Sequence, residues 1–443
     1  MTTPDNGHGG PEDDIRRSTK AQPVGKGQVP GPEGEQRAAF RDVFAVGEFR
    51  ALWLAQILSV AGDQLARVAL TVLVYDRTGS ALLAAVTYAA SIVPTFLGGV
   101  MLASLADRRP RREVMIACDV VRCGLVLVMA VPGLPVGALV ALLVAVTLVG
   151  APFNSARAAV YPDVLTGDSY VLGTAVTLTT YQAAQVLGFV AGGTLVAALG
   201  VRTSLVADAV TFAASALIIR AWTRWRPAAR GSGPPAGRRG PARSGRLARA
   251  FSGARLVLAT PALRTPMLYG WLAGFYNAPE GIAAPLARML GGGSVTVGLV
   301  LGAEAFGATA GAVAFSRLVD PPRRLRWMGP LAIAACGSLL LFAARPRLPA
   351  ALAILAVSGV CACYQLAANA AFVSAAPPAH RSQAFGLAQG GMNLGQGLVM
   401  VLAGAAASRF SPAAVVVVCG GAGVAAALAI AVTGSRQRPS SGR

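Results

Sequence analysis

Two charged side chains lie near the middle of residues 50–75, the first long apolar stretch of the chain. Asp63 and Arg67 are four residues apart, so on a helix they share one face. An ionisable residue inside a membrane span is costly and is by default a candidate for function. We expect an Asp63–Arg67 ion pair beside a central cavity, with Asp63 accepting a proton when Arg67 moves away. A fixed structural ion pair is the alternative that these two residues leave open.

Two glutamates occupy similar positions in the second half of the chain. Glu280 lies near the centre of residues 265–287, between Pro279 and Pro285, and prolines there would kink a helix and free backbone carbonyls. Glu304 lies near the middle of residues 295–317. Glu280 could bind a proton or a cationic substrate, or it could lie nearer the extracellular mouth. Glu304 could be a proton site or a protonated packing contact. With Asp63, they are the candidates for proton coupling.

A further acid–base pair lies toward the cytoplasmic end of residues 113–131. Asp119 and Arg122 are three residues apart and share a helical face. We expect them to pair with each other or with the loop that contains Asp107, forming a gating network rather than a substrate site. Asp208 is expected to be shallow and hydrated.

Polar and aromatic residues elsewhere in the apolar stretches could line a substrate cavity. For each of them, a hydrogen bond between helices is at least as good an explanation. These candidates are Tyr88, Tyr181, Gln185, Trp271, Tyr276, Asn277, Gln365, Asn369 and Asn393.

The composition predicts the elements that position these residues. Of 443 residues, 54% are apolar and only 13% are charged, whereas soluble domains average about 25% charge. A helix needs about 20 apolar residues to cross a membrane. The sequence therefore predicts an all-α polytopic membrane protein with twelve transmembrane helices in two six-helix pseudo-repeat bundles. The expected spans are 50–75, 81–105, 113–131, 136–156, 170–199, 203–221, 265–287, 295–317, 327–344, 349–374, 382–407 and 412–433.

The distribution of basic residues predicts the topology. Most of the 39 Lys and Arg residues fall on the two tails and the even-numbered loops, which places both termini in the cytoplasm. The net charge of +20 is thus a topology signal, consistent with a lipid bilayer and not nucleic acid as the partner. The expected domains are a disordered tail (1–49), a six-helix bundle (50–221), a cytoplasmic Arg/Gly/Pro-rich linker (222–263), a second bundle (264–434) and a short cytoplasmic tail (435–443).

The residue types argue against a catalytic or metal-dependent protein. Only two histidines are present, His8 in the tail and His380 in a loop, and the six cysteines all lie in apolar stretches. No ATP-binding Walker A sequence is present. We expect no catalytic residue, no metal and no cofactor, with a proton gradient as the energy source. A membrane enzyme or a non-transporting receptor is the less favoured class.

The loop after the second span carries a recognisable pattern. Asp107, Arg108, Arg111 and Arg112 match the G-x-x-x-D-R-x-G-R-R loop of the major facilitator superfamily, with Ala103 and Pro110 at the glycine positions. The chain resembles this superfamily in that loop and in its six-plus-six organisation. Ion pairs of such a loop could lock one face of the protein in one state and break in the other.

Other segments resemble the drug-exporter branch with macrolide and enterobactin exporters. They are residues 49–53, 62–63, 153–157 and 162–163, and a glycine motif at Gly188, Gly192 and Gly193. Small residues four apart let helices approach closely. The resemblance implies a monomeric antiporter in the bacterial plasma membrane that exports a small, largely apolar molecule such as an antibiotic or secondary metabolite. An importer or uniporter of the same fold is the alternative.

Overall fold

The computed structural model describes residues 1–2, 40–95, 98, 109–227, 255, 257–377 and 381–435. In this described part of the chain the regular structure is entirely helical. The elements are α1 (Phe40–Ala45), α2 (Gly47–Thr78), α3 (Ala81–Ala90), α5 (Arg111–Met129), α6 (Val136–Val164), α7 (Asp168–Trp222), α9 (Pro261–Trp271), α10 (Ala273–Tyr276), α11 (Ala278–Gly281), α12 (Ala283–Met289), α13 (Ser294–Leu318), α14 (Pro321–Ser338), the 3-10 helix η1 (Leu339–Ala344), α15 (Leu348–Cys361), α16 (Tyr364–Ala375), α17 (Arg381–Ala407) and α18 (Pro412–Ser435).

The helices account for the twelve expected membrane spans. Eight stretches are long and apolar enough to cross a membrane by length and composition, and a shorter apolar helix covers Ala81–Thr95. Within the described residues, the spans are α2, α3, α5, α6, the two halves of α7, α9–α12 together, α13, α14 with η1, α15–α16, α17 and α18. The prediction of an all-α polytopic membrane protein is confirmed.

Glycine and serine end and begin the helices where the sequence predicts breaks. Gly79 closes α2 in the left-handed conformation (φ 63°), and its N–H donates to the Tyr75 carbonyl. The Ser80 hydroxyl then accepts from the Leu83 N–H and caps α3. Inside α7, Gly200 has φ 80° and ψ 167°, which breaks the helix into two spans. This break falls between the expected spans 170–199 and 203–221.

The seventh span is broken into four short helices, α9 to α12. The breaks fall at Leu272, Asn277 and Ile282, so Glu280 lies in the four-residue helix α11. Pro279 is in the first turn of α11, where its missing N–H needs no partner. The proline-rich sequence thus produces a stronger interruption than the single kink predicted.

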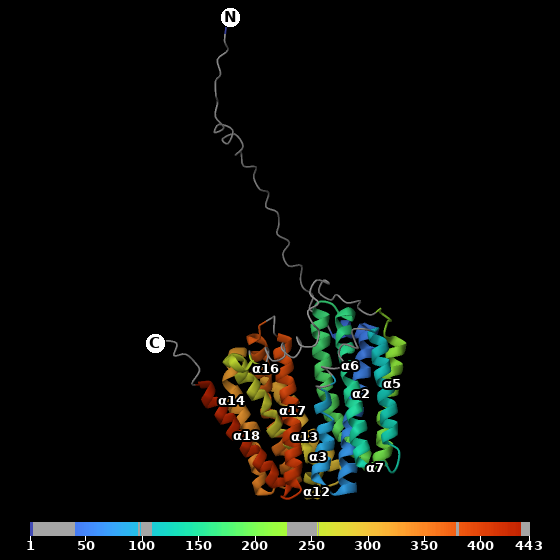
Figure 1. Ribbon diagram of the computed structural model, residues 1–443, viewed down its shortest axis with the longest axis vertical. Helices are drawn as coiled ribbons and strands as arrows, with labels where there is room; N and C mark the ends of the chain where they lie inside the picture. The colour runs from blue at the N-terminus through green and yellow to red at the C-terminus, as the bar shows by residue number, and fades with distance from the viewer. Residues whose placement is uncertain are drawn as a thin grey trace. The chain divides into compact units, whose positions relative to one another are not determined.

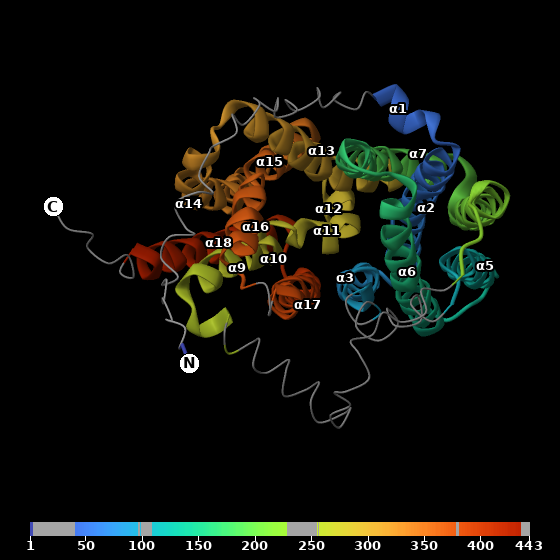
Figure 2. The same ribbon diagram turned by 90° about the horizontal axis from the view of Figure 1, so that it is seen from above.

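Two sets of helices pack side by side (Figures 1 and 2). In the first, α2 packs against α7, and α5 packs against α6 and α7. In the second, α13 packs against α15, and α14 packs against α18. The two sets meet where α3 lies beside α17 and where α7 contacts α13, and Figure 2 places α3 and α17 next to each other.

The contacts between the two sets are close. A Cβ on Gly193 of α7 would be 2.6 Å from the Ser294 carbonyl oxygen and 3.0 Å from Gly298 Cα in α13. Gly404 of α17 allows a similar approach to the start of α3. Arg288 of α12 donates to Asp76 of α2 over 2.5 Å. These residues adjoin the loop after the first span and the loop before the eighth span.

The expected tails and linker fall largely outside the described residues, so their boundaries stay predictions. The structure differs at residues 40–49, where α1 and the start of α2 are helical. Val43 and Phe49 are fully buried there, and the Phe44 ring lies edge-on to Trp53 at 5.1 Å. This apolar anchoring explains why the end of the expected tail folds.

Candidate functional site in the membrane interior

A small cavity of about 150 Å³ lies inside the first six spans and is lined by ionisable side chains. Its lining includes Asp63 and Arg67 of α2, Arg122 of α5, Arg157 of α6 and Asp208 of α7. Five ionisable groups around one cavity in a membrane interior are energetically costly unless they pair or serve a function.

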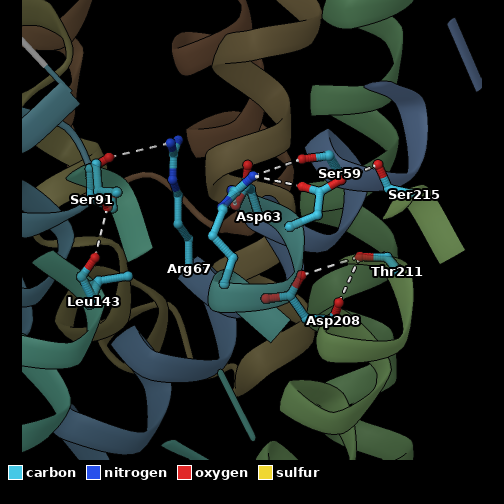
Figure 3. A network of polar contacts seen from close by, with 11 residues as sticks. Ser59, Asp63, Arg67, Ser91, Leu143, Asp208, Thr211 and Ser215 are labelled. Carbon is cyan, nitrogen blue, oxygen red and sulfur yellow. Dashed lines mark hydrogen bonds and ion pairs between the residues drawn. The ribbon is translucent and has the colours of Figure 1, made fainter. Parts of the chain in front are cut away.

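Asp63 is held by an arginine from another helix. Arg122 Nη2 donates to Asp63 Oδ1 over 2.5 Å, and Arg122 Nη1 donates to the Ser59 hydroxyl over 3.1 Å (Figure 3). The guanidinium also lies 4.0 Å from the centre of the Phe212 ring. Asp63 and Ser59 are one turn apart on α2, so a single arginine from α5 binds both.

The Asp63–Arg67 ion pair expected from the sequence is absent from the described structure. The Arg67 side chain extends instead toward Ser91, to whose carbonyl it donates over 3.5 Å (Figure 3). A spacing of four residues placed both groups on one side of α2, but it carried no information about the arginine that approaches from α5. The buried Arg122, whose side chain is 5% exposed, takes the carboxylate.

The predicted proximity of Asp119 and Arg122 is present. Arg122 Nη1 lies 3.9 Å from Asp119 Oδ1, and the Ser215 hydroxyl of α7 donates to Asp119 Oδ2 over 2.6 Å. Asp119 is completely buried. Arg122 therefore serves two carboxylates, and the network joins α2, α5 and α7.

Asp208 is buried, not shallow and hydrated as expected. It is 1% exposed, and the Thr211 hydroxyl lies 3.4 Å from its Oδ1. Gly62 of α2 makes this burial possible, because a Cβ there would collide with Asp208 Oδ1. Its Oδ2 has no hydrogen-bond partner among the described residues. Asp208 thus belongs to the same site as Asp63.

A second group of charges lies where the two sets of helices meet. The Tyr88 hydroxyl of α3 lies against the Glu280 carboxyl of α11, and Arg67 is within electrostatic range of both. Glu304 of α13 is 6% exposed and interacts electrostatically with Glu280. Arg67 and Glu280, from opposite bundles, thus lie within electrostatic range of each other, and Asp63 lies one turn from Arg67 on α2.

A second cavity, of about 290 Å³, is lined only by the second set of helices. It brings together three of the predicted cavity residues, Trp271, Gln365 and Asn369. Gln365 Nε2 donates to the Gly270 carbonyl and to the Tyr276 hydroxyl, each over 3.0 Å, and Trp271 Nε1 donates to the Ala388 carbonyl over 2.9 Å. No ionisable side chain is among the described residues that line this cavity.

The other predicted cavity residues are scattered. Tyr181 lines the charged cavity, and Gln185 is half-buried on α7. Tyr276 is buried, and its hydroxyl accepts a hydrogen bond from Gln365 Nε2. Asn277 has a buried side-chain oxygen without a partner among the described residues. Asn393 accepts a long hydrogen bond of 3.4 Å from Gln389.

The residues of the Asp–Arg loop divide into two groups. Asp107 and Arg108 lie outside the described residues. Arg111 donates to Asp163 over 2.7 Å, and Arg112 donates to the Arg220 carbonyl. Both contacts stay within the first six spans, and the gating role predicted for this loop stays a prediction.

The three predicted packing glycines have different neighbours. A Cβ on Gly188 would lie 3.0 Å from Gln64 Cβ, and one on Gly192 would lie 3.1 Å from Leu65 Cα, both in α2. Gly193 instead packs against α13 across the boundary between the two sets. The adjacent glycines Gly192 and Gly193 therefore allow close contacts with two different helices.

Sequence reasoning missed three contributors. Asp208 was placed too shallow, Arg157 was named only within the resemblance segment 153–157 and not as part of the charged cavity that it lines, and the pair of Asp76 and Arg288 was not foreseen. The available signal for Arg157 was an arginine within an apolar segment. No spacing could reveal Asp76 and Arg288, which are 212 residues apart.

Comparison with known proteins identifies the family. The family model described as Major Facilitator Superfamily matches residues 52–343 and 280–443. No curated protein matches the sequence.

Several solved transporters have a similar fold. A bacterial homologue of the human lysosomal transporter Spinster, in an inward-facing and occupied conformation, has a TM-score of 0.64 at 15% identity and covers 88% of this chain and 96% of its own. A POT family transporter in complex with a thioalcohol-conjugated peptide has a TM-score of 0.71 at 10% identity, with coverages of 88% and 96%. The nucleoside transporter NupG has a TM-score of 0.64 at 13% identity, with coverages of 88% and 100%. Together with the family match across almost all of the twelve-span region, these likenesses in fold lead to one conclusion: the chain belongs to the major facilitator superfamily.

Proposed function

We propose that this protein is a secondary active transporter that exports a small, largely apolar molecule in exchange for protons. The observation that carries the proposal is the set of carboxyl groups in the membrane interior. Asp63 is joined to Arg122 at 2.5 Å, and Glu280 lies against Tyr88 and within electrostatic range of Arg67 across the boundary between the bundles. Charges that face a neighbouring bundle can change partners when the bundles move.

The proton would act by changing the partners of Arg67 and Arg122. Protonation of Asp63 would release Arg122 to its other carboxylate, Asp119, which is 3.9 Å away. Protonation of Glu280 would remove its attraction to Arg67 and so weaken the link between α2 and α11. A proton thus favours one arrangement of the bundles, and the substrate favours the other.

Alternating access would come from rocking of the two six-helix bundles. The close contacts at Gly193 and Gly298 and the ion pair of Asp76 and Arg288 seal one end of the spans. With both termini in the cytoplasm, as the basic loops predict, the sealed end would be extracellular. The resemblance to bacterial drug exporters supports a location in the bacterial plasma membrane.

The direction of transport rests on the sequence resemblance to drug exporters. The solved relatives include proteins named as peptide and nucleoside transporters, so import or uniport is the competing function. A largely apolar substrate is supported by the second cavity, which has aromatic and amide side chains and no ionisable ones in its described lining.

Efflux from cells that lack their own exporters tests the proposal. Cells are loaded with a panel of fluorescent dyes and antibiotics, and wild type is compared with Asp63→Asn, with and without a protonophore. We expect wild-type export that the protonophore abolishes and that Asp63→Asn lacks at equal membrane levels. Faster accumulation than in cells with empty vector would contradict export and support import.

A further inference from the structure

The cavity in the second bundle has a regular lining that the charged cavity lacks. On α16, Gln365, Asn369 and Phe372 are spaced four and three residues apart, and on α17, Phe385, Gln389 and Met392 repeat that spacing. Each set therefore forms a stripe along one helical face. The Phe372 and Phe385 rings meet edge-on at 6.3 Å. The two stripes place aromatic rings at one end of the cavity and amides beside them.

Trp271 of α9 forms the third wall, and a glycine positions it. A Cβ on Gly391 of α17 would collide with Trp271 Cζ2 and lie 2.6 Å from Cε2. The absence of that Cβ lets the indole lie against α17, where Nε1 donates to the Ala388 carbonyl over 2.9 Å. The indole edge is thus fixed by its hydrogen bond.

The amides supply hydrogen-bonding groups that the protein only partly uses. Asn369 is exposed and makes no side-chain hydrogen bond within the described structure, and Gln389 is exposed and makes only the long bond to Asn393. Gln365 uses its nitrogen on Gly270 and Tyr276. Free amides beside fixed aromatic faces are the polar and apolar parts of a small-molecule site.

We propose that this cavity binds the aromatic portion of an uncharged substrate, with a planar ring between Trp271 and the two phenylalanines and its polar edge on Asn369 and Gln389. The inference rests on the proposed transport function and names the class of substrate. A cavity of about 290 Å³ is at the small end of ligand sites, so it fits a ring with short substituents. A cation would find no carboxylate among the described lining residues, whereas the charged groups of the first bundle remain available for protons.

Equilibrium binding to the purified full-length protein in lipid nanodiscs tests the site. The probe is radiolabelled chloramphenicol, an uncharged nitroaromatic amide, and the competitor is ethidium, a planar cation. Gly391→Ala adds the Cβ that displaces Trp271. Gly386→Ala is the matched control on the same helix, because a Cβ there meets nothing within 4 Å.

We expect wild type to bind chloramphenicol and ethidium to compete poorly. Gly391→Ala and Trp271→Ala should weaken binding by about tenfold, the equivalent of one aromatic contact. Trp271→Phe should retain part of the affinity, and Gly386→Ala should match wild type. Monodisperse elution and an unchanged melting temperature in each variant would exclude misfolding as the cause.

Three results would overturn the proposal: no chloramphenicol binding by wild type, equal binding by Gly391→Ala and Gly386→Ala, or stronger binding of ethidium that Gly391→Ala abolishes. The proposed function fails separately. Protonophore-sensitive export of another compound, without chloramphenicol binding, would support the proposed transport function and refute this substrate class. Gly391-dependent binding of chloramphenicol without any proton-driven transport would support the proposed binding site and refute the proposed transport function.

Discussion

Asp63 of α2 is bound by Arg122 of α5 over 2.5 Å, although Arg67 lies only one turn away from it on its own helix. The two arginines therefore have different partners. Arg122 is buried within the first bundle, where it is near both Asp63 and Asp119, whereas Arg67 donates to the Ser91 carbonyl and lies within electrostatic range of Glu280 of the second bundle.

Replacement of Arg122 should therefore damage the fold more than replacement of Arg67. Arg122→Ala leaves two carboxylates without their cation, and removal of one partner of a buried ion pair costs about 3–5 kcal/mol. Arg67→Ala removes a single hydrogen bond of 3.5 Å and a longer-range attraction to Glu280, with no ion pair within the described residues. Thermal unfolding of the purified variants measures the difference. A lower melting temperature for Arg67→Ala than for Arg122→Ala would mean that the network around Asp63 is not structural.

The Asp76–Arg288 pair should bias which end of the protein is open. Both side chains are about half exposed, so the pair contributes no more than about 1 kcal/mol, yet that suffices to shift a two-state population severalfold. Arg288→Asp should open the sealed end, and the double variant Asp76→Arg with Arg288→Asp should restore closure.

The readout is the rate at which a charged maleimide labels Val297→Cys, a position that is 2% exposed between the two bundles. The protein without the Val297→Cys substitution has six native cysteines, and its labelling rate gives the background to be subtracted. Labelling that is equally slow in wild type, Arg288→Asp and the double variant would show that the pair does not control closure.

Gly193→Ala should prevent the tight approach of α7 and α13. The added Cβ would meet backbone atoms of Ser294 and Gly298 at 2.6 and 3.0 Å, and backbone cannot give way as a flexible side chain can. Transport should fall at equal expression, with faster labelling of Val297→Cys. Gly124→Ala is the control, because a Cβ at that helical position meets nothing within 4 Å. Wild-type transport and labelling in Gly193→Ala would refute a functional need for the contact.

The sequence predicted the architecture more fully than the pairing of charges. Length and apolarity define spans locally, and Gly79 and Gly200 mark helix ends through their own backbone freedom, so these features were readable. The partner of Asp63 depends on how α5 packs against α2, which residue spacing along one helix does not encode. Asp208 was misplaced for the same reason, because its burial requires Gly62 on a different helix.

The site residues of the second bundle were found only as a scattered set. Trp271, Gln365 and Asn369 were each candidates, but their meeting in one cavity follows from the way α9, α16 and α17 pack together. Prolines predicted that the seventh span would bend, but residue spacing did not predict which helices would surround Trp271.

The most direct test of the central claim is substrate transport into everted membrane vesicles under an imposed pH gradient, with Asp63→Asn, Glu280→Gln and Glu304→Gln combined. The substrate is the panel compound that wild type exports, and membrane levels are matched. We predict that the gradient accelerates transport by wild type and has no effect on the triple variant, which should still catalyse downhill exchange. Gradient-driven transport by the triple variant at the wild-type rate would contradict proton coupling through these carboxyl groups.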